Sequence, residues 1–457
     1  MEVIKRKLER FGDRMKKWRI NLQRLTRIVK GKGKAGPVAT RTLPQLPIEV
    51  WENVIDHLWD DRDALKACIF VCRAWYSPSR FHLHRQIEIQ SVKGVKAYVK
   101  ELKQTPELSK RAHNMTIDGI WGSDLSSLST AAILLARKLP RLERLTIRRS
   151  EWRPWTMHKD IFLHLSAFSV TRLVLYDVTF PSVTVFGRLI CALPCLVELK
   201  CTHLIFTHDH FHRDAFGLYC NRVKICSLSI MLKHTAVPDS LIDFLANICI
   251  SSHLQRCIIR HDPSSEYSPY KGELQRLLNA SLGSLSELQF DLELARSERQ
   301  TDTEMSAADS VLSLNHNISL QRLWLCIWRI PQCSDLDSLC QALLSIKSGQ
   351  LREVVIAFIY PYRVPRFMEA VKNVLKIHES AYHQNMDKYL SSDPFRTLSK
   401  VEFVLVALDV FSKDLEEIAV TAAEEQWKQI FAPLFPRLTK RGIFHATVRE
   451  HGYKDTF

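Results

Sequence analysis

Glycine and long hydrophobic runs are both scarce in this 457-residue chain. It has 14 glycines, and because cofactor-binding folds need glycines at their phosphate turns, this scarcity counts against such folds. The apolar stretches, such as residues 401–410, end at about ten residues, whereas a membrane-spanning helix needs about 18. The N-terminus is charged, which is not typical of a secretory signal. The sequence therefore predicts no transmembrane segment and a cytoplasmic location, a nuclear one, or both.

Motifs for catalysis, cofactors and metals are also lacking. No two of the 12 cysteines have the two-residue spacing of a zinc site or a redox motif. The closest pairs are Cys68/Cys72 and Cys191/Cys195, four apart among apolar neighbours, which indicates buried thiols in a reducing compartment. There is no phosphate-binding loop and no nucleophile elbow. We predict no catalytic site, no cofactor and no metal.

Positive charge is concentrated at one end of the chain. Residues 1–41 hold 14 Lys/Arg against three acids, which accounts for +11 of the formal net charge of +15. Apolar residues recur there in alternating steps of four and three from Ile4 to Val29, which predicts a helix with one apolar stripe. Gly31, Gly33, Gly36 and Pro37 end this pattern and indicate a linker.

Four roles fit this stripe. It could form a coiled coil, lie on an anionic membrane, contact nucleic acid, or dock on another part of the same chain. The alternating spacing suits a two-helix seam better than a wider lipid-facing surface. Among the interactions with other molecules, self-association through residues 4–29 is therefore favoured.

A second region, residues 43–85, has the pattern of short amphipathic helices. The residues after Leu46 and Pro47 give its first helix an apolar face, made by Val50, Trp51, Val54, Ile55 and Leu58. Asp60, Asp61 and Asp63 can start a second helix, which Pro78 is expected to end. A unit this small cannot bury its own apolar surface, so a partner protein is expected.

These residues resemble an F-box. The resemblance rests on Leu46-Pro47-Ile48-Glu49-Val50-Trp51, on Leu65-Lys66-Ala67-Cys68 and on Val71-Cys72-Arg73-Ala74-Trp75, with the F-box spacing between them intact. The form of these motifs is similar to that of the F-box proteins expanded in mushroom-forming (basidiomycete) fungi.

The resemblance implies a partner, the Skp-family adaptor that joins F-boxes to a cullin–RING ubiquitin ligase. The residues that match its adaptor-binding positions are Leu46, Pro47, Val50, Trp51, Val54, Ile55, Leu58, Leu65, Val71 and Trp75. Three of them, Leu65, Val71 and Trp75, match positions that are divided between the F-box core and the adaptor contact.

From residue 86 onward a short pattern recurs: apolar, two variable, apolar, one variable, apolar. It starts at Leu142, Val170, Leu196, Ile225, Leu254, Leu285, Leu320, Leu351 and Leu398. The intervals run from 26 to 35 residues with a last one of 47, and this rhythm is more informative than the triplet itself. The residue before the second apolar position is polar in every case, as a half-buried strand requires.

Helical patterns lie between these strands, for example at residues 185–193 and 336–346. One strand plus one helix per repeat resembles a leucine-rich-repeat solenoid. The predicted fold class is therefore α/β, an N-terminal all-α F-box followed by an irregular leucine-rich-repeat solenoid. The Asn usual after the third apolar position is replaced at or near Val178, Leu204 and Trp328, so irregularity is expected. An extra helix near residues 367–390 and a capping strand near 438–448 are also expected.

Candidate target-binding residues follow from this alternation. The residue between the second and third apolar positions should point away from the core, and Trp324 occupies one such position with Arg322 beside it. Because Trp and Arg dominate the energetics of protein interfaces, this pair is the first candidate; alternatively, Trp324 packs beneath a long loop. Arg172 and Tyr176 are further candidates.

A histidine-rich segment follows the third strand. His203, His208, His210 and His212 could bind a transition metal, but Asp209 is the single carboxylate among them and the segment falls where a loop is expected. A solvated loop is therefore favoured over a metal site.

The predicted organisation has three parts: a basic helix and linker at 1–42, an F-box at 43–85, and a degenerate leucine-rich-repeat domain with an irregular C-terminal cap at 86–457. The predicted function is that of a non-catalytic substrate-recognition subunit of an SCF-type cullin–RING E3 ubiquitin ligase, with a protein as its target. Such a receptor acts by proximity, because it raises the local concentration of target lysines near the ubiquitin-carrying enzyme. The alternative is a repeat scaffold that uses its F-box outside a ligase.

Overall fold

The computed structural model describes residues 47–59, 61–209, 211–212, 223–232, 239–246, 248–261, 271–291, 312–328, 333–360, 371–372, 380–407 and 417–450. The predicted basic helix at residues 4–29, the linker that follows it, Leu46 and His210 lie outside the described residues. The chain divides into two compact units, Met1–His57 and Leu58–Phe457.

In the first unit, the described residues form the predicted helix, α2 (Ile48–His57). The N–H of Val50 donates to the carbonyl of Pro47 at 3.1 Å, so the proline, which has no N–H, stands just before the helix. Ile55 is buried, whereas Val50 and Val54 are exposed. The helix therefore has one apolar residue in a core and others on the surface.

The second unit begins with two short helices, α3 (Arg62–Cys68) and α4 (Arg73–Leu83). The side chain of Asp61 accepts a hydrogen bond from the N–H of Ala64 at 2.9 Å and caps α3, as predicted. The second helix expected to end at Pro78 is two helices, divided at residues 69–72, and Pro78 lies inside α4. Residue 78 would normally bond to the carbonyl of Ala74, and Ala74 is exposed, so water can replace the missing bond.

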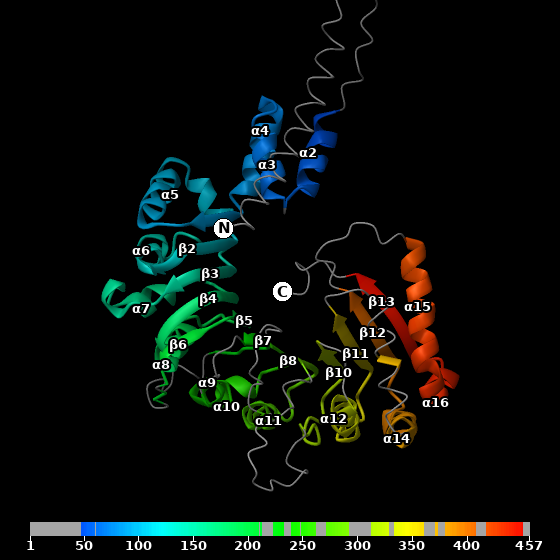
Figure 1. Cartoon of the computed structure of the whole chain (residues 1–457). Coiled ribbons are helices and arrows are strands. Elements are labelled where there is room, and N and C mark those ends of the chain that lie inside the picture. Colours follow the sequence, from blue (N-terminus) through cyan, green and yellow to red (C-terminus); the bar gives the residue numbers. More distant parts are fainter. Residues whose placement is uncertain are drawn as a thin grey trace, which may run out of the picture. The chain divides into compact units, whose positions relative to one another are not determined.

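After these helices, parallel strands build one continuous sheet (Figure 1). Its strands are β1 (Gln86–Ile89), β2 (Asn114–Asp124), β3 (Arg144–Glu151), β4 (Arg172–Ser182), β5 (Glu198–Thr202), β6 (Ile205–His208), β7 (Ser227–Leu232), β8 (Arg256–His261), β9 (Glu287–Asp291), β10 (Arg322–Ile327), β11 (Glu353–Tyr360), β12 (Lys400–Ala407) and β13 (Phe444–Glu450). Each strand pairs with the next along the chain, except that β6 pairs with β4 and β5 pairs directly with β7.

The nine predicted strands are all present, and each begins two residues after the start of its apolar pattern. β1, β2 and β6 were not predicted, and β6 contains His208 of the segment that was expected to be a loop. His84 stands where the pattern before β1 needs an apolar residue, and Ala112, which is buried, is a small apolar residue at the start of the pattern for β2. β13 lies where a capping strand was expected, near residues 438–448.

Helices connect the strands and lie along one face of the sheet (Figure 1). In order they are α5 (Val92–Gln104), η1 (Pro106–Lys110), α6 (Ser126–Leu135), η2 (Pro154–Thr156), α7 (Ile161–Leu165), α8 (Val183–Cys191), α9 (Asp239–Leu245), α10 (Ile248–Ser251), α11 (Lys271–Ala280), α12 (Cys333–Leu344), α14 (Ser380–Leu390), η7 (Asp393–Phe395), α15 (Glu417–Phe431), η8 (Ala432–Leu434) and α16 (Pro436–Lys440). The predicted helices at 185–193 and 336–346 correspond to α8 and α12, and the expected extra helix corresponds to α14.

The core lies between these helices and the sheet. The apolar residues of each repeat pattern, such as Leu142, Leu145 and Ile147, are buried in one continuous cluster with the inner sides of the helices. Each repeat alone would leave its apolar side exposed, and stacking the repeats covers it. The second unit is thus a parallel α/β repeat solenoid. The other face of the sheet, on which none of the described helices lies, is called the helix-free face below.

The expected irregularity has a specific form. Arg149, Asp177 and His203 stand at the same position of three consecutive repeats, and all three have a left-handed backbone, with φ of 52°, 52° and 56°. This conformation is uncommon for residues other than glycine. At the first of these positions the guanidinium of Arg149 donates two hydrogen bonds to the carboxylate of Asp118, at 3.0 and 2.7 Å. These bonds offset part of the backbone strain.

Gly119 marks a place where the backbones of β2 and β3 come close together. The register between these strands shifts between Asp118 and Ser123. A Cβ on residue 119 would collide with the hydroxyls of Ser123 and Ser150 and with the carbonyl of Arg149. The irregular pairing of these two strands therefore requires glycine here.

Among the helices in the described ranges, none is long and apolar enough to cross a membrane.

Candidate binding surfaces

The predicted adaptor-binding residues on α2 differ in accessibility. Pro47, Val50 and Val54 are exposed, Trp51 is half-buried and Ile55 is fully buried. The exposed valines lie one helical turn apart, on the same side of α2. The structure therefore leaves Val50 and Val54 accessible to a partner and places Ile55 in a core.

The predicted residues of the second unit divide in the same way. Leu65 is buried in α3, Leu58 and Trp75 are half-buried, and Val71, in the turn between α3 and α4, is 51% exposed. The structure thus distinguishes buried from exposed positions among residues that the sequence could not divide between core and contact. Leu65 stabilises the hairpin of α3 and α4, whereas Val71 is available for contact.

Sequence reasoning missed the most exposed apolar residue of this hairpin. Phe70, next to Val71 in the turn, is 87% exposed, and Trp59, Tyr76 and Phe81 are exposed as well. The available signal was the uninterrupted apolar run 69–72, because a turn between helices is normally polar. The α3–α4 hairpin thus carries several large apolar side chains on its surface, which is typical of a protein contact.

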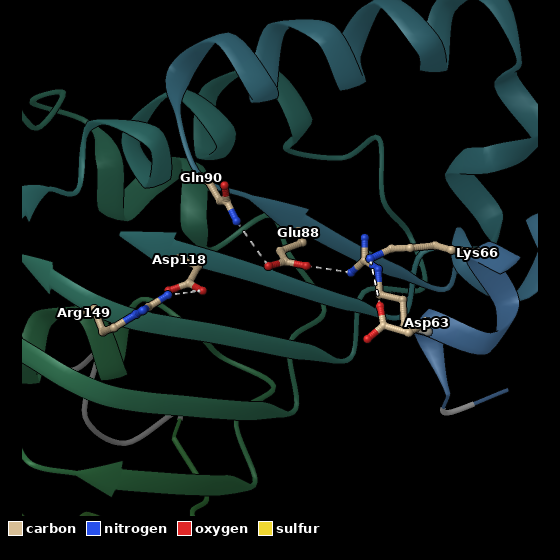
Figure 2. A network of polar contacts seen from close by, with 7 residues as sticks. Asp63, Lys66, Glu88, Gln90, Asp118 and Arg149 are labelled. Atoms are coloured by element: carbon tan, nitrogen blue, oxygen red, sulfur yellow. Dashed lines mark hydrogen bonds and ion pairs between the residues drawn. The ribbon is translucent and has the colours of Figure 1, made fainter. Parts of the chain in front are cut away.

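The hairpin is tied to the first repeats by charged and aromatic contacts. A guanidinium nitrogen of Arg62 in α3 lies 3.0 Å from the carboxylate of Glu88 in β1, and Glu88 also accepts a bond from Gln90 (Figure 2). The Arg111 guanidinium lies over the Phe81 ring of α4, 4.8 Å from its centroid. These contacts come from both helices of the hairpin and connect it to the start of the sheet.

A half-buried histidine completes this joint. His84, just after α4, accepts a hydrogen bond from the Nε of Arg80 at 3.0 Å, and Arg80 also pairs with Glu101 of α5 at 3.2 Å. Burial lowers the pKa of His84, and the positive charges of Arg80 and Arg111 lower it further against the opposing effect of Glu101. His84 is therefore neutral near pH 7 and serves as an acceptor rather than as a charge.

On the helix-free face, a row of paired charges runs across the strands. Its members are the residues before the second apolar position on β4, β5 and β8 to β12. Arg322, a predicted target-binding residue, lies 2.9 Å from Glu287 and 3.6 Å from Glu353 on the neighbouring strands. Arg172, another candidate, lies 3.1 Å from Glu198. Both arginines are exposed but already have carboxylate partners within the sheet.

Trp324 lies beside a second, smaller apolar cluster. This cluster is on the helix-free face of β10 to β12 and consists of Cys326, Trp328, Val355, Ala357, Ile359, Val404 and Val406, with Trp324 packed against it. Trp324 is half-buried, and its indole nitrogen is buried. The structure thus places Trp324 at the margin of a packed cluster, away from the exposed Tyr176 on β4.

Tyr176 lies next to the histidine-rich segment. Its ring centroid is 5.8 Å from that of His203, and Nδ1 of His203 lies 3.4 Å from a carboxylate oxygen of Asp177. His208, at the end of β6, lies with Nδ1 3.1 Å from the carbonyl of Pro181. Within the described ranges, no group of three His, Cys, Asp or Glu side chains is arranged to hold a metal ion.

The described cysteines range from buried to exposed, with Cys191 and Cys226 half-buried. Cys201, Cys257 and Cys326 are buried, and burial raises their pKa values, to about 12 in the case of Cys257. The prediction that all cysteines lie in the core is wrong for Cys72 and Cys195, which are exposed. Cys72 is the N-cap residue of α4 and Cys195 lies in the turn that follows α8, where an apolar sequence neighbourhood does not ensure burial.

Comparison with known proteins gives little further information. No protein-family model matches the chain, and no curated protein matches it. Among solved structures, one similar chain comes from the crystal structure of the Rad7 and Elc1 complex in yeast. The two chains are 11% identical, the match covers 80% of this chain and 94% of that one, and the TM-score is 0.29. A TM-score this low assigns neither a fold nor a function to this chain.

Proposed function

We propose that this chain is a substrate-recognition subunit of an SCF-type cullin–RING ubiquitin ligase. In this proposal the F-box-like helices bind a Skp-family adaptor, the repeats bind a target protein, and the chain has no catalytic site of its own. The proposal starts from the resemblance of residues 43–85 to an F-box.

The observation that carries the proposal is the apolar surface of the α3–α4 hairpin. Phe70 and Val71 stand side by side in its turn with most of their surface exposed to water, a costly arrangement unless another protein covers it. On α2, Val50 and Val54 are exposed in the same way. These residues fall within the segment that resembles an adaptor-binding module.

The joint between the hairpin and the sheet supports the same function. A receptor must hold its target at a defined position relative to its adaptor. The ion pairs Arg62–Glu88 and Arg80–Glu101 connect the hairpin to the first repeat from two directions. Each such pair contributes little on its own at the surface, but two pairs and the Arg111–Phe81 contact restrict movement about the joint.

Co-expression of the full chain with a Skp-family adaptor tests the proposal. Burying a phenylalanine side chain contributes about 1.5–3 kcal/mol, so Phe70→Ser/Val71→Ser is expected to weaken the complex roughly ten- to hundredfold. Leu46→Ala/Pro47→Ala should weaken it as well. A matched control is Trp155→Ser/Leu163→Ser, which changes two equally exposed apolar residues on the repeats and should leave adaptor binding unchanged.

Equal recovery of adaptor with the wild type and with both F-box variants would refute adaptor binding through these helices, as would no recovery with any of them. Recovery of the adaptor without any cullin in the complex would favour the alternative, a repeat scaffold whose F-box acts outside a ligase. The affinity is best measured by titration calorimetry of the purified pair, because pull-down alone does not separate weak from strong binding.

A further inference from the structure

The helix-free face has two halves of opposite charge. On residues 144–148 of β3, residues 172–176 of β4, and β5, β7 and β8, it carries one acid and six bases: Glu198 and Arg144, Arg148, Arg172, Lys200, Arg256 and Arg260. On β9 to β12 it carries two bases and four acids: Arg322 and Lys400, and Glu287, Asp291, Glu353 and Glu402. The six bases on β3 to β8 are called the basic half.

Most charges of the basic half are not neutralised within the sheet. Arg172 pairs with Glu198 at 3.1 Å, and Arg256 pairs with Glu287 at 3.3 Å. Within the described part of the chain, the remaining four bases make no ion pair, namely Arg144, Arg148, Lys200 and Arg260. In the other half, by contrast, Arg322 and Lys400 each lie between carboxylates.

Lys200 lies close enough to Arg144 and Arg260 to be repelled by them. Burial lowers the pKa of Lys200, and the positive charges of Arg260 and Arg144 lower it further, with Glu198 acting in the opposite direction. Arg144 and Arg260 stand on β3 and β8, on either side of Lys200 in the sheet. The bases thus stand on four of the five strands, with only the uncharged β7 between β5 and β8, and a bound anion would relieve the repulsion.

Apolar side chains are interspersed with these bases. Val174 and Ile258 are half-buried on the same face, and Tyr176 is exposed beside Arg148 in the strand register. Nucleic-acid bases stack best on aromatic side chains, and Val174 and Ile258 are aliphatic. A protein segment has both acidic and apolar side chains, so this mixed surface is better suited to a protein than to a nucleic acid.

We propose that the basic half binds an acidic segment of the target protein, in which carboxylate or phosphate groups meet the unpaired bases and apolar side chains meet Val174 and Ile258. This inference rests on the proposed function, in which the repeats bind a target protein. It adds that the bound segment of the target is acidic. Such a face rejects basic segments by repulsion, so it contributes specificity as well as affinity.

Fluorescence anisotropy of labelled peptides with the full chain tests the inference. Three peptides share one apolar framework and differ at four positions, which are Glu, phosphoserine or Gln; a single-stranded DNA of similar length is the fourth probe. We expect the Glu and phosphoserine peptides to bind. Their affinity should fall as salt rises, because dissolved ions screen the charges and the Debye length is only about 8 Å at physiological ionic strength. The Gln peptide should bind at least about tenfold more weakly than the acidic peptides.

Arg144→Glu/Arg148→Glu reverses two unpaired charges on β3 and should weaken binding of the acidic probes by about tenfold or more. The control Lys388→Glu/Lys428→Glu makes the same change in net charge on exposed positions of α14 and α15 and should have no effect. Lys200→Met removes one charge and keeps the length of the side chain, so it should cause a smaller loss of affinity. Because this change is milder, it still tests the inference if the double variant does not fold.

The outcomes distinguish recognition of carboxylates, of protein phosphates and of DNA. Binding of the phosphoserine peptide alone, or of both acidic peptides, supports the inference and identifies the recognised group. Equal binding of the Gln peptide, or equal weakening by the control variant, would refute it. Tighter binding of the DNA than of every peptide would refute it in favour of a nucleic acid. Adaptor binding is measured separately, so its loss with peptide binding retained would refute only the proposed function.

Discussion

Replacing Glu402 with glutamine is expected to loosen the end of the sheet. Glu402 is 2% exposed, and its carboxylate accepts from Arg449 at 2.6 Å and from Thr447 at 2.8 Å, both on β13, and lies 2.6 Å from the ammonium of Lys400. Burial raises the pKa of Glu402, but the hydrogen bonds from Lys400, Thr447 and Arg449 outweigh burial and hold it below the ordinary value of 4.5. The charged carboxylate therefore joins β12 to the last strand.

The magnitude follows from the burial of each partner. Breaking a fully buried ion pair costs about 3–5 kcal/mol. The side chains of Lys400 and Arg449 are 33% and 42% exposed, so water compensates for part of the loss, and we expect about 2 kcal/mol. In a repeat array each unit contacts only its neighbours, so the cost should appear as local opening of β13 rather than as a uniform loss of stability.

Hydrogen exchange resolved to individual peptides measures this opening. About 2 kcal/mol corresponds to roughly 30-fold faster exchange of peptides from β13, with little change in β3. The control Glu425→Gln removes an exposed carboxylate from α15 and should leave both regions unchanged. Unaltered exchange in β13, or equal acceleration throughout the sheet, would refute the role assigned to Glu402.

The same carboxylate predicts a pH dependence. Its pKa in the folded state lies below the unfolded value, so its contribution is fully present above about pH 4.5 and is lost as the pH falls through the folded pKa. Above that range, β13 should exchange more slowly in the wild type than in Glu402→Gln. As the pH falls through the folded pKa, this difference in exchange rate should disappear. A difference between the two proteins that persists unchanged through this range would contradict the assignment.

Two further predictions concern local packing and thiol reactivity. Gly119→Ala should destabilise the protein by about 1–3 kcal/mol in thermal unfolding, because its Cβ collides with neighbouring strands, whereas Gly283→Ala, which has open space around it, should change stability by less than about 0.5 kcal/mol. With a thiol reagent at pH 8, mass spectrometry of the folded protein should show Cys72 and Cys195 modified well before Cys257, whose pKa burial raises to about 12.

Strand positions were predictable because each depends on a few consecutive residues. The pattern that starts at Leu285 is enough to place β9, since alternation decides which side chains face the core. The same local rule failed for β1, where His84 is neutral and takes the place of an apolar residue through contacts with Arg80 and Glu101. Arg80 lies only four residues before His84, but Glu101 comes from the next helix, α5, which a short window of sequence does not contain.

The properties of the helix-free face were less predictable for a similar reason. Arg322 and Trp324 were correctly expected on the strand that became β10, but their environment depends on neighbours about one repeat away in sequence. Arg322 meets Glu287 and Glu353 only in the register of the sheet. Glu402 stands at the same repeat position as Trp324, so it was expected to point away from the core. It lies on the helix-free face but is buried by its contacts with β13. The register between strands therefore decides which charged side chains become neighbours, and the sequence alone does not give this register.

The position of the basic half along the sheet has a consequence for the proposed receptor. The sheet order separates β3 from β1 by two strand steps and β8 from β1 by six, or on the order of 10 and 30 Å along the sheet at about 4.8 Å per step. β1 is also the strand that Arg62 of the hairpin contacts. A segment bound on the basic half would thus be connected to the hairpin through hydrogen-bonded strands and not through a flexible linker. The reach of the target's own chain beyond that segment, rather than motion of the receptor, would then decide which of its lysines approach the ligase.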